Sequence, residues 1–161
     1  MRVTRSRTNR TDLGAGLARV DRMNAELARA TLMSQHDGLR TQLDRCRVLA
    51  RRLLAGTPVE RQLDVALSQL RIDFVAHNAT ETTLVGGLLR GLPTRGPLLI
   101  TRMLEEHLAE HSEFWEKLAG TARGVALRID DLAEELEGHM AAEERTFLSP
   151  RVLRSASAAD Q

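Results

Sequence analysis

Apolar residues recur along most of this chain at alternating steps of four and three residues, the spacing that places them on one face of an α-helix. Four stretches carry such a stripe, and segments rich in glycine and proline separate them at 55–58, 90–97 and 119–124. No stretch shows the alternation of a β-strand. The pattern therefore predicts an all-α protein, a four-helix up-down-up-down bundle with helices near 20–54, 58–90, 97–119 and 125–148.

The two ends of the chain differ from the region between them. The first ten residues contain four arginines, and leucines repeat just after them. We therefore expect a basic N-terminal extension over residues 1–22, mobile or partly helical, then the bundle over 23–150 and a flexible tail over 151–161. Within the bundle, Thr57-Pro58-Val59-Glu60 is typical of a helix start, with a capping threonine and a proline at the first helical position.

The stripes carry polar side chains at positions where a bundle normally places leucine. All five histidines lie on them, and a glutamate follows two of these by four residues; the positions are His36, His77, Glu81, His107, His111, His139 and Glu143. A single histidine on such a stripe is ordinarily a core residue. Burying five imidazoles and two carboxylates together is costly, because each unpaired buried charge destabilises the fold by several kcal/mol. A shared metal centre removes this cost, since every one of these groups then becomes a ligand.

The spacing of these residues suits two metal ions. Three pairs are four residues apart, and therefore lie above one another on a helix face: His77/Glu81, His107/His111 and His139/Glu143. With the imidazole of His36, the set exceeds the needs of one ion. Two ions bridged by both carboxylates and by one oxo or hydroxo group would use eleven of the twelve positions of two octahedra. Imidazole with carboxylate favours iron over manganese and zinc, and the open position would bind O2, NO or peroxide.

Composition excludes several other classes of protein. Cys46 is the one cysteine, so there is no internal disulfide and no cysteine-rich metal site, and we expect a reducing, cytoplasmic location. The absence of tyrosine excludes a tyrosyl radical. A net charge of +1 gives no reason to expect nucleic acid or a membrane surface as a partner, and we find neither a transmembrane segment nor a secretory signal. The aromatic residues Phe114 and Trp115 are expected in the core.

The candidate ligands also follow one another in a familiar order. His36 is followed by HNATE (77–81), HLAEH (107–111) and HMAAEE (139–144). Over about residues 30–150 this order resembles the hemerythrin family and its HHE-type relatives. The resemblance implies a four-helix bundle around a non-heme di-iron centre, with ligands at His36, His77, Glu81, His107, His111 and His139.

The last carboxylate ligand has two candidates. The oxygen-carrying hemerythrins place an aspartate five residues after the last histidine, where this chain has Glu144. Other relatives place a glutamate four residues after it, which here is Glu143. We favour Glu143 because it stays on the stripe, whereas a residue five positions on is rotated by about 140° around an ideal helix.

Three functions remain open from the sequence. The first is a protein that binds or senses O2 or NO, or buffers iron. The second is an enzyme that decomposes peroxide or NO, or uses O2 to oxidise a small substrate. The third is a bundle that carries zinc instead of iron. A histidine-rich ligand set donates little negative charge and so favours ligand binding or simple redox turnover over chemistry that needs high-valent iron. The oligomeric state is not determined by the sequence.

Overall fold

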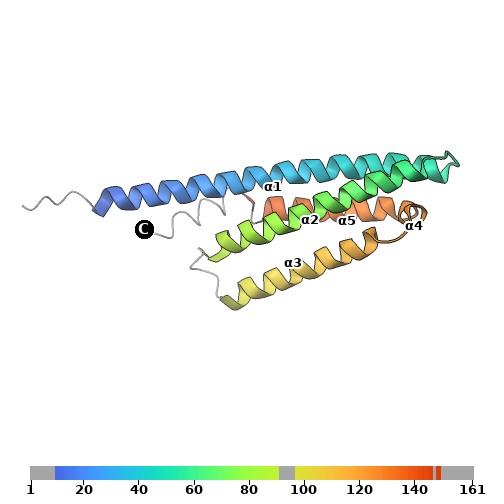
Figure 1. The fold of residues 1–161 in the computed structure, drawn as a ribbon. Helices are drawn as coiled ribbons and strands as arrows, with labels where there is room; N and C mark the ends of the chain where they lie inside the picture. Colours follow the sequence, from blue (N-terminus) through green and yellow to red (C-terminus); the bar gives the residue numbers. More distant parts are fainter. Residues whose placement is uncertain (1–9, 91–96, 147, 150–161) are drawn as a thin grey trace, which may run out of the picture.

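The bundle consists of long helices with short connections, and the computed structural model describes residues 10–90, 97–146, 148 and 149 (Figure 1). The helices are α1 (Arg10–Leu54), α2 (Glu60–Arg90), α3 (Pro97–Leu118), α4 (Ala122–Ala126) and α5 (Ile129–Arg145). The described part of the chain contains no strand. None of the described helices combines the length and hydrophobicity that a membrane-spanning segment needs.

The four long helices form a closed ring. α1 packs against α2 and α5, and α3 packs against the other sides of the same two helices. Successive long helices run in opposite directions (Figure 1), so the predicted all-α up-down-up-down bundle is confirmed. The first part of α1 extends beyond the ends of the other helices in the same view.

Two helix starts differ from the prediction. α1 begins at Arg10 rather than near residue 20, because no proline interrupts this segment and its isolated glycines do not stop a helix that continues on both sides. It passes without a break through residue 22, and the division into an extension and a bundle stays a prediction. α2 begins at Glu60, so Thr57 is not its capping residue. The segments 1–9 and 151–161, which include the expected tail, lie outside the described residues.

The expected fourth helix consists of two helices, because the helical structure is interrupted between Ala126 and Ile129. α4 begins after Thr121, whose hydroxyl accepts a hydrogen bond from the Gly124 N–H at 3.2 Å. Arg128 then leaves the helical conformation (φ −125°, ψ 10°). Its guanidinium donates from Nε to the Lys117 carbonyl at 2.8 Å and from Nη2 to the Ala119 carbonyl at 2.6 Å. Arg128, at the break between α4 and α5, therefore donates hydrogen bonds to carbonyls at the end of α3 that the helix itself leaves without partners.

The apolar core fills one end of the bundle, next to α4. It includes Leu39, Phe74, Phe114 and Leu136, and the two phenylalanine rings meet edge to face at 6.0 Å. The predicted burial of Phe114 is confirmed, whereas that of Trp115 is wrong, since Trp115 is 45% exposed. Adjacent residues on a helix point about 100° apart, so only one of the two can face the core.

A second apolar region lies on the other side of the predicted ligands. Leu32, one turn before His36 on α1, is fully buried, and Leu148, which follows the end of α5, is 1% exposed. Arg29 Nε donates a hydrogen bond to the Leu148 carbonyl at 2.9 Å, which ties the end of the described chain to α1. The predicted ligand positions therefore lie between two apolar regions.

The Arg128 contacts lead to a stability prediction. We expect Arg128→Met to lower the free energy of unfolding by about 1–3 kcal/mol, because hydrogen bonds from a charged group to two helix-end carbonyls are lost while the aliphatic stem is kept. Urea denaturation followed by circular dichroism measures this. Arg123→Met, at an exposed position of α4, is the matched control and should change little. Equal denaturation midpoints for the two variants would contradict the role of Arg128.

Candidate metal centre

The seven polar residues predicted from the stripes come together in the middle of the bundle, and we call them the His/Glu cluster. Each long helix contributes one or two of them: His36 from α1, His77 and Glu81 from α2, His107 and His111 from α3, and His139 and Glu143 from α5. The spacing of four residues within three of the helices turns each pair to the same face. The bundle thus brings together residues that lie up to about a hundred positions apart.

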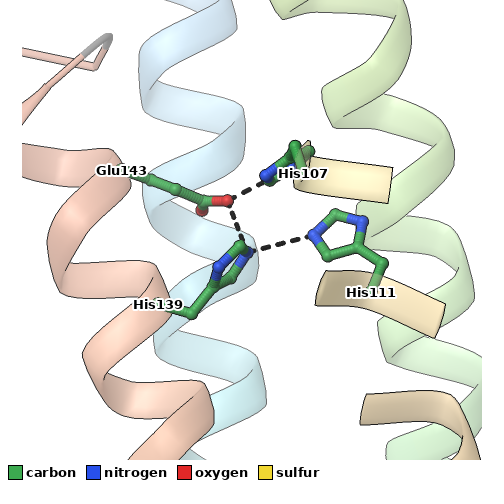
Figure 2. A group of neighbouring side chains, drawn as sticks. All are labelled: His107, His111, His139 and Glu143. Carbon is green, nitrogen blue, oxygen red and sulfur yellow. Dashed lines mark hydrogen bonds and ion pairs between the residues drawn. The ribbon is translucent and has the colours of Figure 1, made fainter. Parts of the chain in front are cut away.

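Three histidines and one carboxylate converge between α3 and α5 (Figure 2). The Nε2 atom of His139 lies 3.0 Å from Nε2 of His111 and 2.7 Å from Oε1 of Glu143. The Nε2 atom of His107 lies 3.6 Å from the same glutamate oxygen. One potential ligand atom from each of these four residues lies within 4.8 Å of those of the others. This group has the size and chemistry to hold one metal ion.

A second group lies toward α1 and α2. One potential ligand atom each from His77, Glu81, His111 and Glu143 again lies within 4.8 Å of those of the others. His36 faces this group from α1, with its ring 5.0 Å from that of His77. The two groups share His111 and Glu143, so they are neighbouring parts of a single centre.

The two carboxylates connect the halves of the cluster. Glu143 turns Oε2 toward His36 Nε2, at 3.0 Å, while its Oε1 faces His139. Glu81 Oε2 lies 2.6 Å from His107 Nε2 on α3 and 3.6 Å from His77 Nε2 on its own helix. Each of the two carboxylates thus faces histidines of two different helices.

Many of these polar atoms are buried without a hydrogen-bond partner. His36 and His77 are fully buried, and the exposed fractions of Glu81 and Glu143 are 1% and 2%. Both ring nitrogens of His77, His111 Nδ1 and Glu81 Oε1 have no hydrogen-bond partner, whereas His36 Nε2 and the two oxygens of Glu143 have ion-pair contacts within the cluster instead. A buried polar atom without a partner costs about 1–3 kcal/mol. Imidazole nitrogen and carboxylate oxygen are metal donors. Metal cations in the middle of the cluster would therefore be partners for the inward-facing atoms, and this set of donor atoms fits such cations.

The environment keeps two of the histidines in the form that binds metal. Burial, together with the neighbouring histidines, lowers the pKa of His77 to about 4 and that of His111 to about 3. Both imidazoles are therefore neutral near pH 7 and carry the free electron pair that a metal needs. Burial also acts on His36 and His139, but their contacts with carboxylates outweigh it and raise the pKa of each.

The pKa values of the two central carboxyl groups, Glu81 and Glu143, are shifted in opposite directions. Burial raises the pKa of Glu81 to about 7. The same burial acts on Glu143, yet contacts with His139 and His36 outweigh it and hold the pKa of Glu143 far below its usual range. The pair therefore shares its charge unevenly, as expected for two carboxyl groups close together in a buried place.

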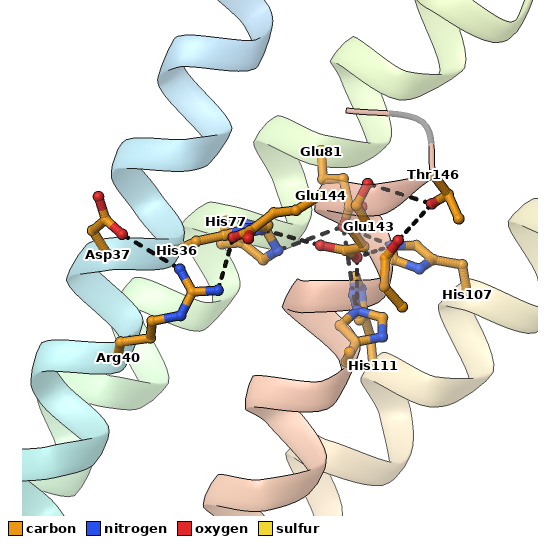
Figure 3. Close-up of polar contacts among 12 residues, drawn as sticks. His36, Asp37, Arg40, His77, Glu81, His107, His111, Glu143, Glu144 and Thr146 are labelled. Carbon is orange, nitrogen blue, oxygen red and sulfur yellow. Dashed lines mark hydrogen bonds and ion pairs between the residues drawn. The ribbon is translucent and has the colours of Figure 1, made fainter. Parts of the chain in front are cut away.

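Glu144 lies outside this set of converging atoms. Its Oε1 lies 2.8 Å from Nδ1 of His36, the nitrogen that faces away from the centre, and it accepts a hydrogen bond from Arg40 Nη2 at 2.8 Å (Figure 3). Of the two candidates for the last carboxylate, the structure turns Glu143 toward the other cluster residues and Glu144 toward the outer side of His36. Glu110 lies in a comparable place, with Oε2 at 3.0 Å from Nδ1 of His139.

The stripes of apolar and polar positions do not predict these outer contacts. Arg40 follows His36 by one helical turn, a spacing that could have placed it beside that histidine. Glu110 gives no such signal, because it is on a different helix from His139 and occupies an exposed position of α3. Contacts of this kind depend on how two helices are rotated against each other.

A surface pocket of about 400 Å3 reaches the cluster between α3 and α5. Its lining consists of Glu110, Glu113, Phe114, Lys117, Glu135, His139 and Ala142. The side chains of His139 and His107 are 8% and 16% exposed, whereas that of His36 is fully buried. The α3/α5 side is thus the more open to solvent.

The chain was also compared with known proteins. The family model described as the hemerythrin HHE cation binding domain matches residues 27–150. No curated protein and no solved structure matches the chain significantly. The matched region contains all seven residues of the His/Glu cluster.

The unpartnered buried atoms lead to a prediction about metal removal. Divalent iron under anaerobic conditions, or zinc, should raise the unfolding temperature relative to chelated protein by about 5–10 °C when present at about a hundred times its dissociation constant. Differential scanning calorimetry measures the shift. The His77→Ala variant should lose most of it, and magnesium, which prefers oxygen ligands, should not produce it. Equal unfolding temperatures with and without transition metal would contradict a metal centre.

Proposed function

Because the chain belongs to the hemerythrin HHE cation-binding family, we propose that its His/Glu cluster holds two iron ions and responds to O2, NO or peroxide. The observation that carries this proposal is the pair of overlapping groups, each able to hold an ion, that share His111 and Glu143. A single ion would leave part of this buried donor set without a partner. Two ions would use all of it.

We assign the seven side chains to the two ions according to their positions. His107, His111 and His139 would hold the ion between α3 and α5, and His36 and His77 the ion toward α1 and α2. Glu81 and Glu143 would bridge them. Two contacts support Glu143 as the bridge, since its two oxygens face His36 and His139 from opposite sides. Its neighbour Glu144 has its own partners outside the cluster.

Iron is the metal that this donor set favours. Imidazole with carboxylate suits iron, with manganese and zinc next. Five imidazole nitrogens and two carboxylates would hold the pair of ions, and a small ligand would bind to the ion that only His36 and His77 supply with imidazoles. An iron pair of this kind supplies reversible binding, or electron transfer, to a small ligand.

The surroundings of the cluster favour ligand binding over oxidation of a substrate. The Phe74 ring meets the His111 ring edge to face at 5.5 Å, and Leu39 and Leu136 lie in the same apolar layer. Such walls exclude water from this side of the site. The chain has no tyrosine that could donate a proton, and Glu144 is held at the outer side of His36.

A second candidate function is an enzyme that decomposes peroxide or NO. The pocket between α3 and α5 favours it, because small solutes can reach His139 from the surface. Both candidates use the same residues in the same roles. They differ in whether the reduced centre is recovered after the ligand leaves.

The ligand assignment predicts the metal content of two matched variants. Wild-type protein should contain about two irons per chain and show near-ultraviolet charge-transfer absorption after aerobic reconstitution. Glu143→Gln should lower the iron content, because the bridge loses its charge, while Glu144→Gln should keep two irons. Metal analysis with absorption spectra checks both. One zinc per chain, without charge-transfer absorption after iron reconstitution, would exclude the di-iron proposal.

The behaviour of the reduced protein distinguishes the two functions. Stopped-flow mixing of the reduced protein with O2 should produce a new absorption band that disappears when the O2 pressure is lowered, with the reduced state recovered. The apolar walls around the site are the reason for this expectation. Rapid irreversible oxidation together with many peroxide turnovers per site would instead favour the enzyme.

A further inference from the structure

His36 is held from both sides of its ring. Its Nε2 faces Glu143 Oε2 at 3.0 Å in the middle of the cluster, and its Nδ1 faces Glu144 Oε1 at 2.8 Å on the outside (Figure 3). Glu143 and Glu144 are consecutive residues of α5, so neighbouring carboxylates contact opposite nitrogens of one imidazole. The outward nitrogen is the one that cannot bind an ion in the cluster.

Glu144 is itself held by a cation. Arg40, one turn after His36 on α1, donates from Nη2 to the same Oε1 atom at 2.8 Å, and its Nη1 lies 3.3 Å from Asp37. The side chains of Glu144 and Arg40 are 23% and 32% exposed. One glutamate oxygen thus accepts from both His36 and Arg40, which connects α5 to α1 beside the centre.

Other histidines of the cluster are held differently. The Nδ1 atoms of His77 and His111 are buried without a hydrogen-bond partner. The Nδ1 atom of His139 faces Glu110, whose side chain is 59% exposed. His36 therefore has an acceptor that is both more buried and braced by an arginine.

We propose that Glu144, braced by Arg40, is a positioning residue that orients His36 and tunes the reduction potential of the ion that His36 holds. This inference rests on the proposed di-iron function. Glu144 accepts the Nδ1–H of His36 and thereby leaves Nε2 as the donor atom that faces the cluster. A carboxylate acceptor also raises the basicity of a ligating imidazole, and a more basic ligand favours the more highly charged, oxidised ion.

Arg40 sets the strength of this effect. Its positive charge balances part of the charge on Glu144, so the carboxylate polarises His36 less than it would alone. Removing the charge of Glu144 and removing that of Arg40 should therefore change the reduction potential in opposite directions. A purely structural link between α1 and α5 would not produce opposite signs.

The test measures iron content and reduction potential in the iron-loaded full chain. Glu144→Gln keeps an oxygen that can accept from both His36 and Arg40 but loses the charge. This variant should retain two irons. Its midpoint potential should rise by about 59 mV for one electron, which corresponds to a change of about tenfold in the reduced-to-oxidised ratio. Arg40→Met should lower the potential. Asp44→Asn, which removes a charge about two turns after His36 on the same helix and contacts Arg47 instead of Arg40, is the matched control and should shift it much less.

The outcomes separate this inference from the function on which it rests. Retention of two irons with opposite shifts in Glu144→Gln and Arg40→Met supports it. An unchanged potential, or an equal shift in Asp44→Asn, overturns it and leaves the di-iron proposal intact. Loss of iron in Glu144→Gln also overturns it, because Glu144 would then be a ligand. Wild-type protein without iron after reconstitution overturns both.

Discussion

The gathering of seven ionisable side chains, five of them buried, in one layer of the bundle is the constraint on which the rest of this structure depends. Imidazole and carboxylate groups without partners are costly in an apolar interior, and this layer contains five of the first and two of the second. The arrangement offsets the cost in part by pairing Glu143 with His36 and His139. The inward-facing atoms that remain without partners are metal donors. The same feature that burdens the fold without metal therefore gives it an affinity for cations.

The helices and their ends place this layer. Apolar residues close it on both sides, with Phe74 and its neighbours toward α4 and Leu32 with Leu148 toward the other end. Arg128, just before α5, donates a hydrogen bond to a carbonyl at the end of α3. Arg29 on α1 donates one to a carbonyl in the segment after α5. Because α3 and α5 supply three of the five histidines, the geometry of that turn bears directly on the centre. The contacts of these two arginines therefore help to hold the helices that carry the cluster.

The two sides of the centre have different surroundings. The α3/α5 side lies against a solvent-accessible pocket, and the carboxylate that faces His139 from outside is largely exposed. The α1/α2 side is closed, and Glu144 and Arg40 hold His36 there. Two ions in such a site would not be equivalent, since their ligands differ in number, exposure and outer partners.

The sequence alone determined the fold class and the residues of the cluster, because helix periodicity acts locally. A stripe with steps of four and three specifies which face of a helix is buried, and therefore that all the candidate ligands face one interior. The same reasoning favoured Glu143 over Glu144, since only Glu143 lies on the stripe. Local signals were weaker at the helix ends: the start of α2 and the break before α5 were missed, and the N-terminal segment was expected to be at most partly helical. The guanidinium of Arg128 reaches carbonyls some ten residues back, which no local pattern shows.

Only the tertiary structure decided what lies behind the cluster. The contact of Glu144 with His36 joins residues 108 positions apart, and that of Glu110 with His139 joins two different helices. Each depends on how two packed helices are rotated about their axes and shifted along them. A pattern of apolar positions does not determine these two quantities closely enough to predict such a contact. Periodicity specifies which residues face inward, and packing decides which atoms of different helices meet.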